Sequence, residues 1–221
     1  MPMDHVPKGQ QRDSSRRDVL RVATGAAGAV GVIGAAGAAA FLVPRLSQRA
    51  PDASDLVRVD VVEVDLAPIA PGQQVMVYWG SWPVFVVRRT PQALATLQQA
   101  SLREQLVDPD SKERQQPPYA GNWGRSVRPD IAVLVGVCTH MGCTPQFHPQ
   151  PSAREPEPDW LGGYLCACHG SKYDLAGRVF KGVPAPYNLP VPPHRFVNDR
   201  TLRIGENPAG VTFDFNSILQ I

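Results

Sequence analysis

The sequence has few cysteines and little net charge. Only four of its 221 residues are cysteine, and none of the four lies outside two short segments. Charged residues make up 19% of the chain and the formal net charge is +2, which argues neither for nor against a nucleic-acid partner. The composition favours one globular domain with an appendage, and any cysteine chemistry is confined to the two segments.

One long stretch lacks charge altogether, the 22 residues from Val22 to Val43. A helix of this length can cross a hydrocarbon core of about 30 Å. More basic residues precede the stretch than follow it, so the positive-inside rule places the N-terminus in the cytoplasm. These residues are Lys8, Arg12, Arg16, Arg17 and Arg21 before the stretch, and Arg45 and Arg49 after it.

The pair Arg16 and Arg17 is typical of a twin-arginine export signal. We therefore expect a single-pass protein of a bacterial inner membrane, with its globular domain on the periplasmic side. The alternative is a signal peptide that is cleaved after export. The expected order is a cytoplasmic N-terminus at residues 1–21, a transmembrane anchor at 22–43, a flexible hinge at 44–55 and the globular domain at 56–221.

The globular domain is expected to be mainly β. The 23 prolines of the chain are roughly twice the usual share of about 5%, which favours loops and short strands over long helices. Apolar and alternating runs predict strands at 57–64, 75–79, 84–88, 131–137, 201–204 and 211–215. A short helix is predicted at 91–99, and a polar, proline-rich excursion over the surface at 106–129.

Two boxes carry the candidate chemistry, CTHMGC at residues 138–143 and CACHGS at residues 166–171. Each box offers one thiol and one imidazole a few positions apart, which suits two loops that share a metal centre. The candidate donors are Cys138 and His140 in the first box, and Cys166 and His169 in the second. Between the boxes, His148 is expected to be an exposed loop histidine.

One cysteine in each box, Cys143 and Cys168, is left over. A disulfide could join them if the loops bring their Cα atoms within about 7 Å. Other chemistries remain open on the residues alone. A zinc site usually has Cys-x2-Cys spacings, a cysteine nucleophile needs only one Cys and one His, and two structural disulfides leave the histidines unexplained.

The boxes resemble those of the Rieske iron-sulfur proteins, whose pattern Cys-x-His-x-Gly-Cys followed by Cys-x-Cys-His-x-Ser is met at every position. The resemblance implies a [2Fe-2S] cluster with Cys138 and Cys166 on one iron and His140 and His169 on the other. It also implies a disulfide between Cys143 and Cys168, hydrogen bonds from Ser171 and Tyr173 to sulfur, and a covering loop made by Pro184, Ala185 and Pro186.

Over the whole chain the resemblance is to the Rieske subunits of quinol:cytochrome c oxidoreductases. It implies a cluster-binding part at about 137–192, inserted in a basal antiparallel β fold. The implied activity takes one electron and a proton from membrane quinol, which His169 reaches, and passes the electron to a c-type cytochrome. Cytochrome b, a c-type cytochrome, quinol and membrane lipid are the expected partners within a dimeric complex, with no nucleic acid. The alternative is the small Rieske subunit of a periplasmic molybdenum oxidase such as arsenite oxidase.

Overall fold

The computed structural model of the protein describes residues 61–150 and 160–220. The expected export signal, anchor and hinge at residues 1–55 lie outside the described residues. Within the described part, no helix has both the length and the hydropathy that a membrane span needs.

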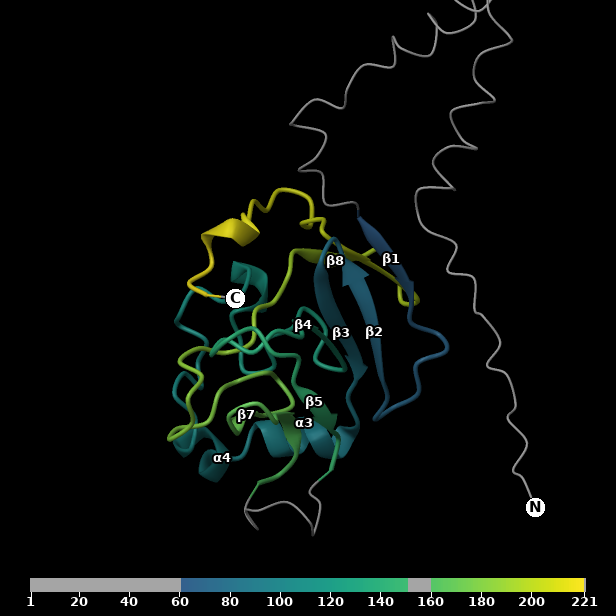
Figure 1. The fold of residues 1–221 in the computed structure, drawn as a ribbon. Coiled ribbons are helices and arrows are strands. Elements are labelled where there is room, and N and C mark those ends of the chain that lie inside the picture. The colour runs from purple at the N-terminus through teal and green to yellow at the C-terminus, as the bar shows by residue number, and fades with distance from the viewer. Residues whose placement is uncertain (1–60, 151–159, 221) are drawn as a thin grey trace, which may run out of the picture. The chain divides into compact units, whose positions relative to one another are not determined.

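Three small antiparallel sheets make up the described fold (Figure 1), which confirms the mainly β prediction. Their strand orders are β1-β9-β8, β2-β3-β4 and β5-β6-β7. The strands are β1 (Val62–Asp65), β2 (Gln74–Trp79), β3 (Trp82–Arg88), β4 (Ile131–Val135), β5 (Gln146–His148), β6 (Gly163–Cys166), β7 (Ser171–Tyr173), β8 (His194–Phe196) and β9 (Thr201–Ile204).

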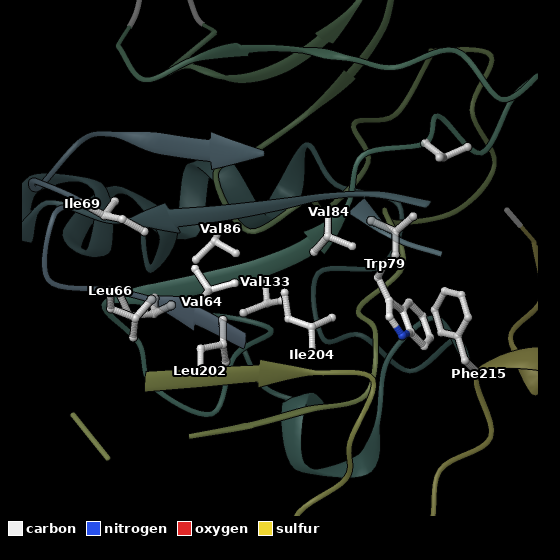
Figure 2. Close-up of a cluster of buried hydrophobic side chains, with 13 residues drawn as sticks. Val64, Leu66, Ile69, Trp79, Val84, Val86, Val133, Leu202, Ile204 and Phe215 are labelled. Carbon is white, nitrogen blue, oxygen red and sulfur yellow. The ribbon is translucent and has the colours of Figure 1, made fainter. Parts of the chain in front are cut away.

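β3 is the central strand of the β2-β3-β4 sheet. Its side chains alternate between the two faces of the sheet, and each face is covered by a different core. Val84 and Val86 belong to a core shared with β1 and β9. Their neighbours Phe85 and Val87 belong to a second core, shared with β6 and β7. Figure 2 shows the first core, with Val84, Val86, Val133 and Ile204 among its clustered side chains. The sheet of β1 and β9 therefore packs against one face of β3, and the sheet of β6 and β7, which carries the second box, packs against the other.

The helix predicted at 91–99 is α3 (Pro91–Leu97), two residues shorter than expected, and a second helix that was not predicted, α4 (Ala100–Glu104), follows it. The Thr90 side chain caps α3 by accepting a hydrogen bond from the Ala93 amide at 3.1 Å, and proline is favoured at the first helical position. Two 3-10 helices, η1 (Pro118–Ala120) and η2 (Phe215–Ser217), complete the described elements.

The predicted strand at 211–215 is wrong. Residues 211–214 have no regular structure, and η2 begins at Phe215 with the Asp214 carboxylate accepting from the Asn216 amide. The Phe215 ring packs edge-to-face against Trp79 with centroids 5.1 Å apart. Phe215 is buried in the first core, with Phe213 and Ile218 packed against it, so the apolar run reflects core packing and not strand pairing.

His194, in β8, is a fully buried histidine and gives the fold a pH dependence. Its Nδ1 lies 2.9 Å from the carbonyl oxygen of Pro192, and its ring packs against Tyr119 with centroids 5.7 Å apart. Burial lowers the pKa of His194 from 6.5 to about 4. The imidazole is therefore neutral in the folded protein at neutral pH.

We expect His194 to destabilise the fold as the pH falls from about 6.5 to about 4. In that window the unfolded chain binds a proton that the folded chain does not, so folding stability rises with pH; the full effect is about 3 kcal/mol. Urea unfolding at pH 7, 5 and 4 should show a smaller acid loss for His194→Phe than for the wild type. Equal losses in the two proteins would contradict this prediction.

Candidate metal centre

The first box is a tight loop that follows directly from β4. The Cys138 amide donates to the Cys143 carbonyl at 2.8 Å, and the Gly142 amide donates to the Cys138 carbonyl at 2.9 Å. Just before the box, a Cβ at Gly136 would come within 2.3 Å of the Phe85 ring. Glycine at this position lets the chain leave β4 against Phe85, and the buried strand fixes where the box begins.

The second box connects β6 to β7, which pair antiparallel with Cys166 opposite Ser171. The Gly170 amide donates to the Cys166 carbonyl at 2.9 Å. Gly170 has a φ of 77°, a left-handed backbone conformation that residues other than glycine rarely adopt. The pairing of β6 with β7 therefore holds the two ends of the second box together, as the hydrogen bonds within the loop do for the first box.

A disulfide joins Cys143 in the first box to Cys168 in the second, with their Cα atoms 6.8 Å apart. This is the pairing that the resemblance implied. Because the disulfide consumes one cysteine from each box, the loops are tied together covalently and one free thiol remains in each. Both free thiols, on Cys138 and Cys166, are buried.

The two free thiols share one site. Burial raises the pKa of the Cys166 thiol, and a hydrogen bond with Cys138 raises it further. The Tyr173 hydroxyl donates to the Cys138 sulfur at 3.2 Å. Burial, reinforced by this contact, raises the pKa of Tyr173, so the hydroxyl stays protonated and available as a donor.

The two histidines of the boxes meet at the surface. The rings of His140 and His169 stand edge-to-face with centroids 4.7 Å apart. His140 is half-buried and His169 is exposed. The two loops therefore bring their imidazoles into contact with each other, as they do their free thiols.

The sulfurs of Cys143, Cys166 and Cys168 lie within 4.8 Å of one another, which on distance alone suits three metal ligands. Since Cys143 and Cys168 are bonded to each other, neither offers a thiolate. The donors that remain in the two loops are two thiols and two imidazoles. This donor set fits a [2Fe-2S] cluster of mixed ligation. Its members are Cys138, Cys166, His140 and His169.

The Pro-Ala-Pro segment is fastened to the second box. The amide of Ala185 donates to the Ser171 hydroxyl oxygen at 3.1 Å. Ala185 and Ser171 are buried, while Pro184 and Pro186 are exposed. The donation from Ser171 to a cluster sulfur stays a prediction, and the contact with Ala185 adds a role for its oxygen.

Two predictions about the surroundings of the boxes are wrong. His148 does not lie on an exposed loop, because it is half-buried in β5 with its ring centroid 5.4 Å from that of Trp160. The polar stretch at 106–129 is not only a surface excursion, because Gln115 and Arg125 within it are fully buried.

Buried arginines hold the turn that follows Tyr173. Arg125 donates to the carbonyl oxygens of Ala176 at 3.2 Å and Gly177 at 3.3 Å. Burial lowers the pKa of Arg125 to about 9, so it remains a cation at neutral pH. Arg178 forms a buried ion pair with Asp174, with Nε 2.6 Å from the carboxylate oxygen. Apart from two charges around a glycine turn, nothing in the sequence indicates these buried arginine contacts.

Known proteins resemble this chain over the part that contains both boxes. Residues 114–193 match the Rieske [2Fe-2S] domain family. The Ubiquinol-cytochrome c reductase iron-sulfur subunit of Allochromatium vinosum is 45% identical over 166 residues, covering 75% of this chain and 79% of the relative. The protein of the same name from Bradyrhizobium diazoefficiens is 42% identical, covering 86% and 94%. That from Rickettsia felis is 36% identical, covering 92% and 100%.

Proposed function

Because this chain belongs to the family of ubiquinol-cytochrome c reductase iron-sulfur subunits, we propose that it is the electron-transferring Rieske subunit of a quinol:cytochrome c oxidoreductase. The observation that carries the proposal is that the two loops pair their buried thiols with each other and their imidazoles with each other, inside the matched domain. The relatives' shared name gives no support to the alternative of an arsenite oxidase subunit.

Cys138 and Cys166 hold one iron in this proposal, and His140 and His169 hold the other. When bound, the [2Fe-2S] group takes up one electron at a time, at a higher potential than an all-cysteine cluster because two neutral imidazoles replace two thiolates. The disulfide leaves no other thiol in the two loops to compete for iron. The role of the protein is therefore to hold the four donor side chains in two loops that the disulfide joins.

The remaining roles follow from exposure. His169 is the more exposed histidine, so its outer ring nitrogen is the atom that reaches a quinol hydroxyl and takes its proton. Tyr173 donates to the Cys138 sulfur, which stabilises the extra negative charge of an added electron. The segment from Pro184 to Pro186 excludes water from the site. Cytochrome b supplies the quinol site, and a c-type cytochrome takes the electron, in a dimeric complex.

The N-terminal part completes the proposal. Residues 1–21 stay in the cytoplasm, 22–43 anchor the chain in the inner membrane, and 44–55 let residues 56–221 move between quinol and cytochrome. The 22 residues without charge support the anchor, since a helix of that length can span a bilayer. Washing membranes with alkaline carbonate should leave the full-length protein in the pellet. Recovery of a shortened protein in the soluble fraction would instead favour a cleaved signal.

The spectrum of the purified full-length protein tests the cofactor directly. We expect a coloured protein with two irons per chain, and an electron paramagnetic resonance (EPR) signal of the mixed-ligand type on reduction. Its potential should lie in the Rieske range of about −150 to +300 mV. A colourless protein that holds zinc and no iron would overturn the proposal.

Tyr173→Phe should lower the reduction potential while leaving the cluster in place. The variant loses the hydroxyl that donates to the Cys138 sulfur, a bond that strengthens as the cluster gains negative charge. A hydrogen bond to a charged group is worth about 1.5–3 kcal/mol, or roughly 65–130 mV for one electron. Redox titration should show this fall. Tyr78→Phe, at an exposed tyrosine in β2, is the matched control, and equal potentials in the two variants would refute the prediction.

A further inference from the structure

The C-terminal end of the chain returns to the first box. The side-chain amide of Gln220 donates to the carbonyl oxygen of Thr139 at 2.6 Å, across 81 positions of sequence. Thr139 stands between Cys138 and His140, the two candidate ligands of that box. In Figure 1 the yellow segment after η2 ends close to the teal part of the chain. The contact therefore joins the C-terminal segment to the backbone between two ligands.

A buried glutamine fixes the direction of Gln220. The Gln115 side chain is fully buried, and its Oε1 accepts from the amides of Leu219 at 3.0 Å and Gln220 at 3.2 Å. Its Nε2 donates to the carbonyl of Gln220 at 2.8 Å and to that of Asn188 at 3.0 Å. The backbone around Gln220 is thus held by a side chain that would be left unsatisfied without it.

Thr139 is held at each of its polar groups. Its amide donates to the Tyr173 hydroxyl oxygen at 3.2 Å, and its own hydroxyl donates to the Tyr187 carbonyl at 2.7 Å. Gln220 donates to the remaining group, the carbonyl, whose peptide unit also carries the nitrogen of His140. The bonds to Thr139 therefore connect Gln220 both to the donor that serves the Cys138 sulfur and to a ligand histidine.

We propose that Gln220, held by Gln115, is a positioning residue for the first ligand loop. It fixes the peptide group of Thr139, and through it the direction of the Tyr173 hydroxyl and the place of His140. Its N–H also turns the positive end of a dipole toward the loop, which favours an added electron. The inference rests on the proposed function, because it presupposes the [2Fe-2S] group between the boxes.

The test compares Gln220→Met with the wild type in the full-length, cluster-containing protein. Methionine keeps the length of the side chain and removes the donor without adding charge. At a fixed ambient potential we expect the ratio of reduced to oxidised cluster to fall about three- to tenfold, a tenfold fall being 59 mV for one electron. The EPR line shape should change as well. Gln220→Glu, which also lacks the donor, should shift the ratio in the same direction.

Gln105→Met is the matched control. Gln105 is exposed beside α4, with its side-chain amide donating to the Ser101 carbonyl at 3.1 Å, and this variant should keep the wild-type potential. If the C-terminal segment were merely structural, Gln220→Met would have a lower melting temperature but an unchanged potential and line shape. That result would overturn this inference and leave the proposed function standing. If the wild type itself gave no Rieske signal, the proposed function would fail, and this inference with it.

Discussion

Replacing Cys166 by serine is expected to abolish the [2Fe-2S] cluster. Cys166 is one of the two buried free thiols, and the other two cysteines are bonded to each other, so no neighbouring thiolate can take its place. A serine hydroxyl is a poor substitute because iron-sulfur clusters depend on soft thiolate ligands. Iron content and the EPR signal of the purified variant should both fall to background.

Ala167→Ser provides the matched control for this prediction. It adds the same hydroxyl at the adjacent, exposed position of the same loop without removing a donor, and should keep the wild-type iron content. The β signal in circular dichroism should persist in both variants, since the basal core of β1, β3, β4 and β9 contains none of the candidate ligands. Full iron content in Cys166→Ser would remove this cysteine from the ligand set.

The four candidate donors could be identified from the sequence because the information for them is local. Each box encodes its own thiol and imidazole at a fixed spacing, and the leftover cysteines could be paired by resemblance alone. The strand that leads to the first box was also predictable, since β4 is an unbroken apolar run, but β6, which leads to the second box, was not among the predicted strands. By contrast, the run at 211–215 misled because Phe215 is apolar for its packing against Trp79 and Trp82, and not because it pairs in a sheet.

The residues that hold the loops could not be predicted in this way. Gln115 and Arg125 lie in a polar, proline-rich stretch whose composition is typical of solvent-exposed chain, yet both are fully buried. Several of their partners lie far away in sequence, such as Ala176 for Arg125 and Gln220 for Gln115. A glutamine that satisfies a distant backbone leaves no periodic signal, because only the folded chain brings the two together.

Arg178→Met is expected to cost about 3–5 kcal/mol of folding free energy. Arg178 and Asp174 form an ion pair with side chains 0% and 2% exposed, and methionine would leave the Asp174 carboxylate buried without its cation. The variant also leaves two carbonyl acceptors, those of Leu97 and Pro109, without the guanidinium that donates to them. Urea unfolding at neutral pH measures the loss.

Arg103→Met tests whether burial causes this loss. Arg103 also pairs with an aspartate, Asp110, but the two side chains are 35% and 48% exposed, and solvent-exposed ion pairs contribute little to stability. Equal losses in the two variants would refute the argument from burial. Because the turn of Asp174 and Arg178 directly follows Tyr173, we expect Arg178→Met also to release iron at lower urea than Arg103→Met. That order would show that the buried frame holds the ligand loops as well as the fold.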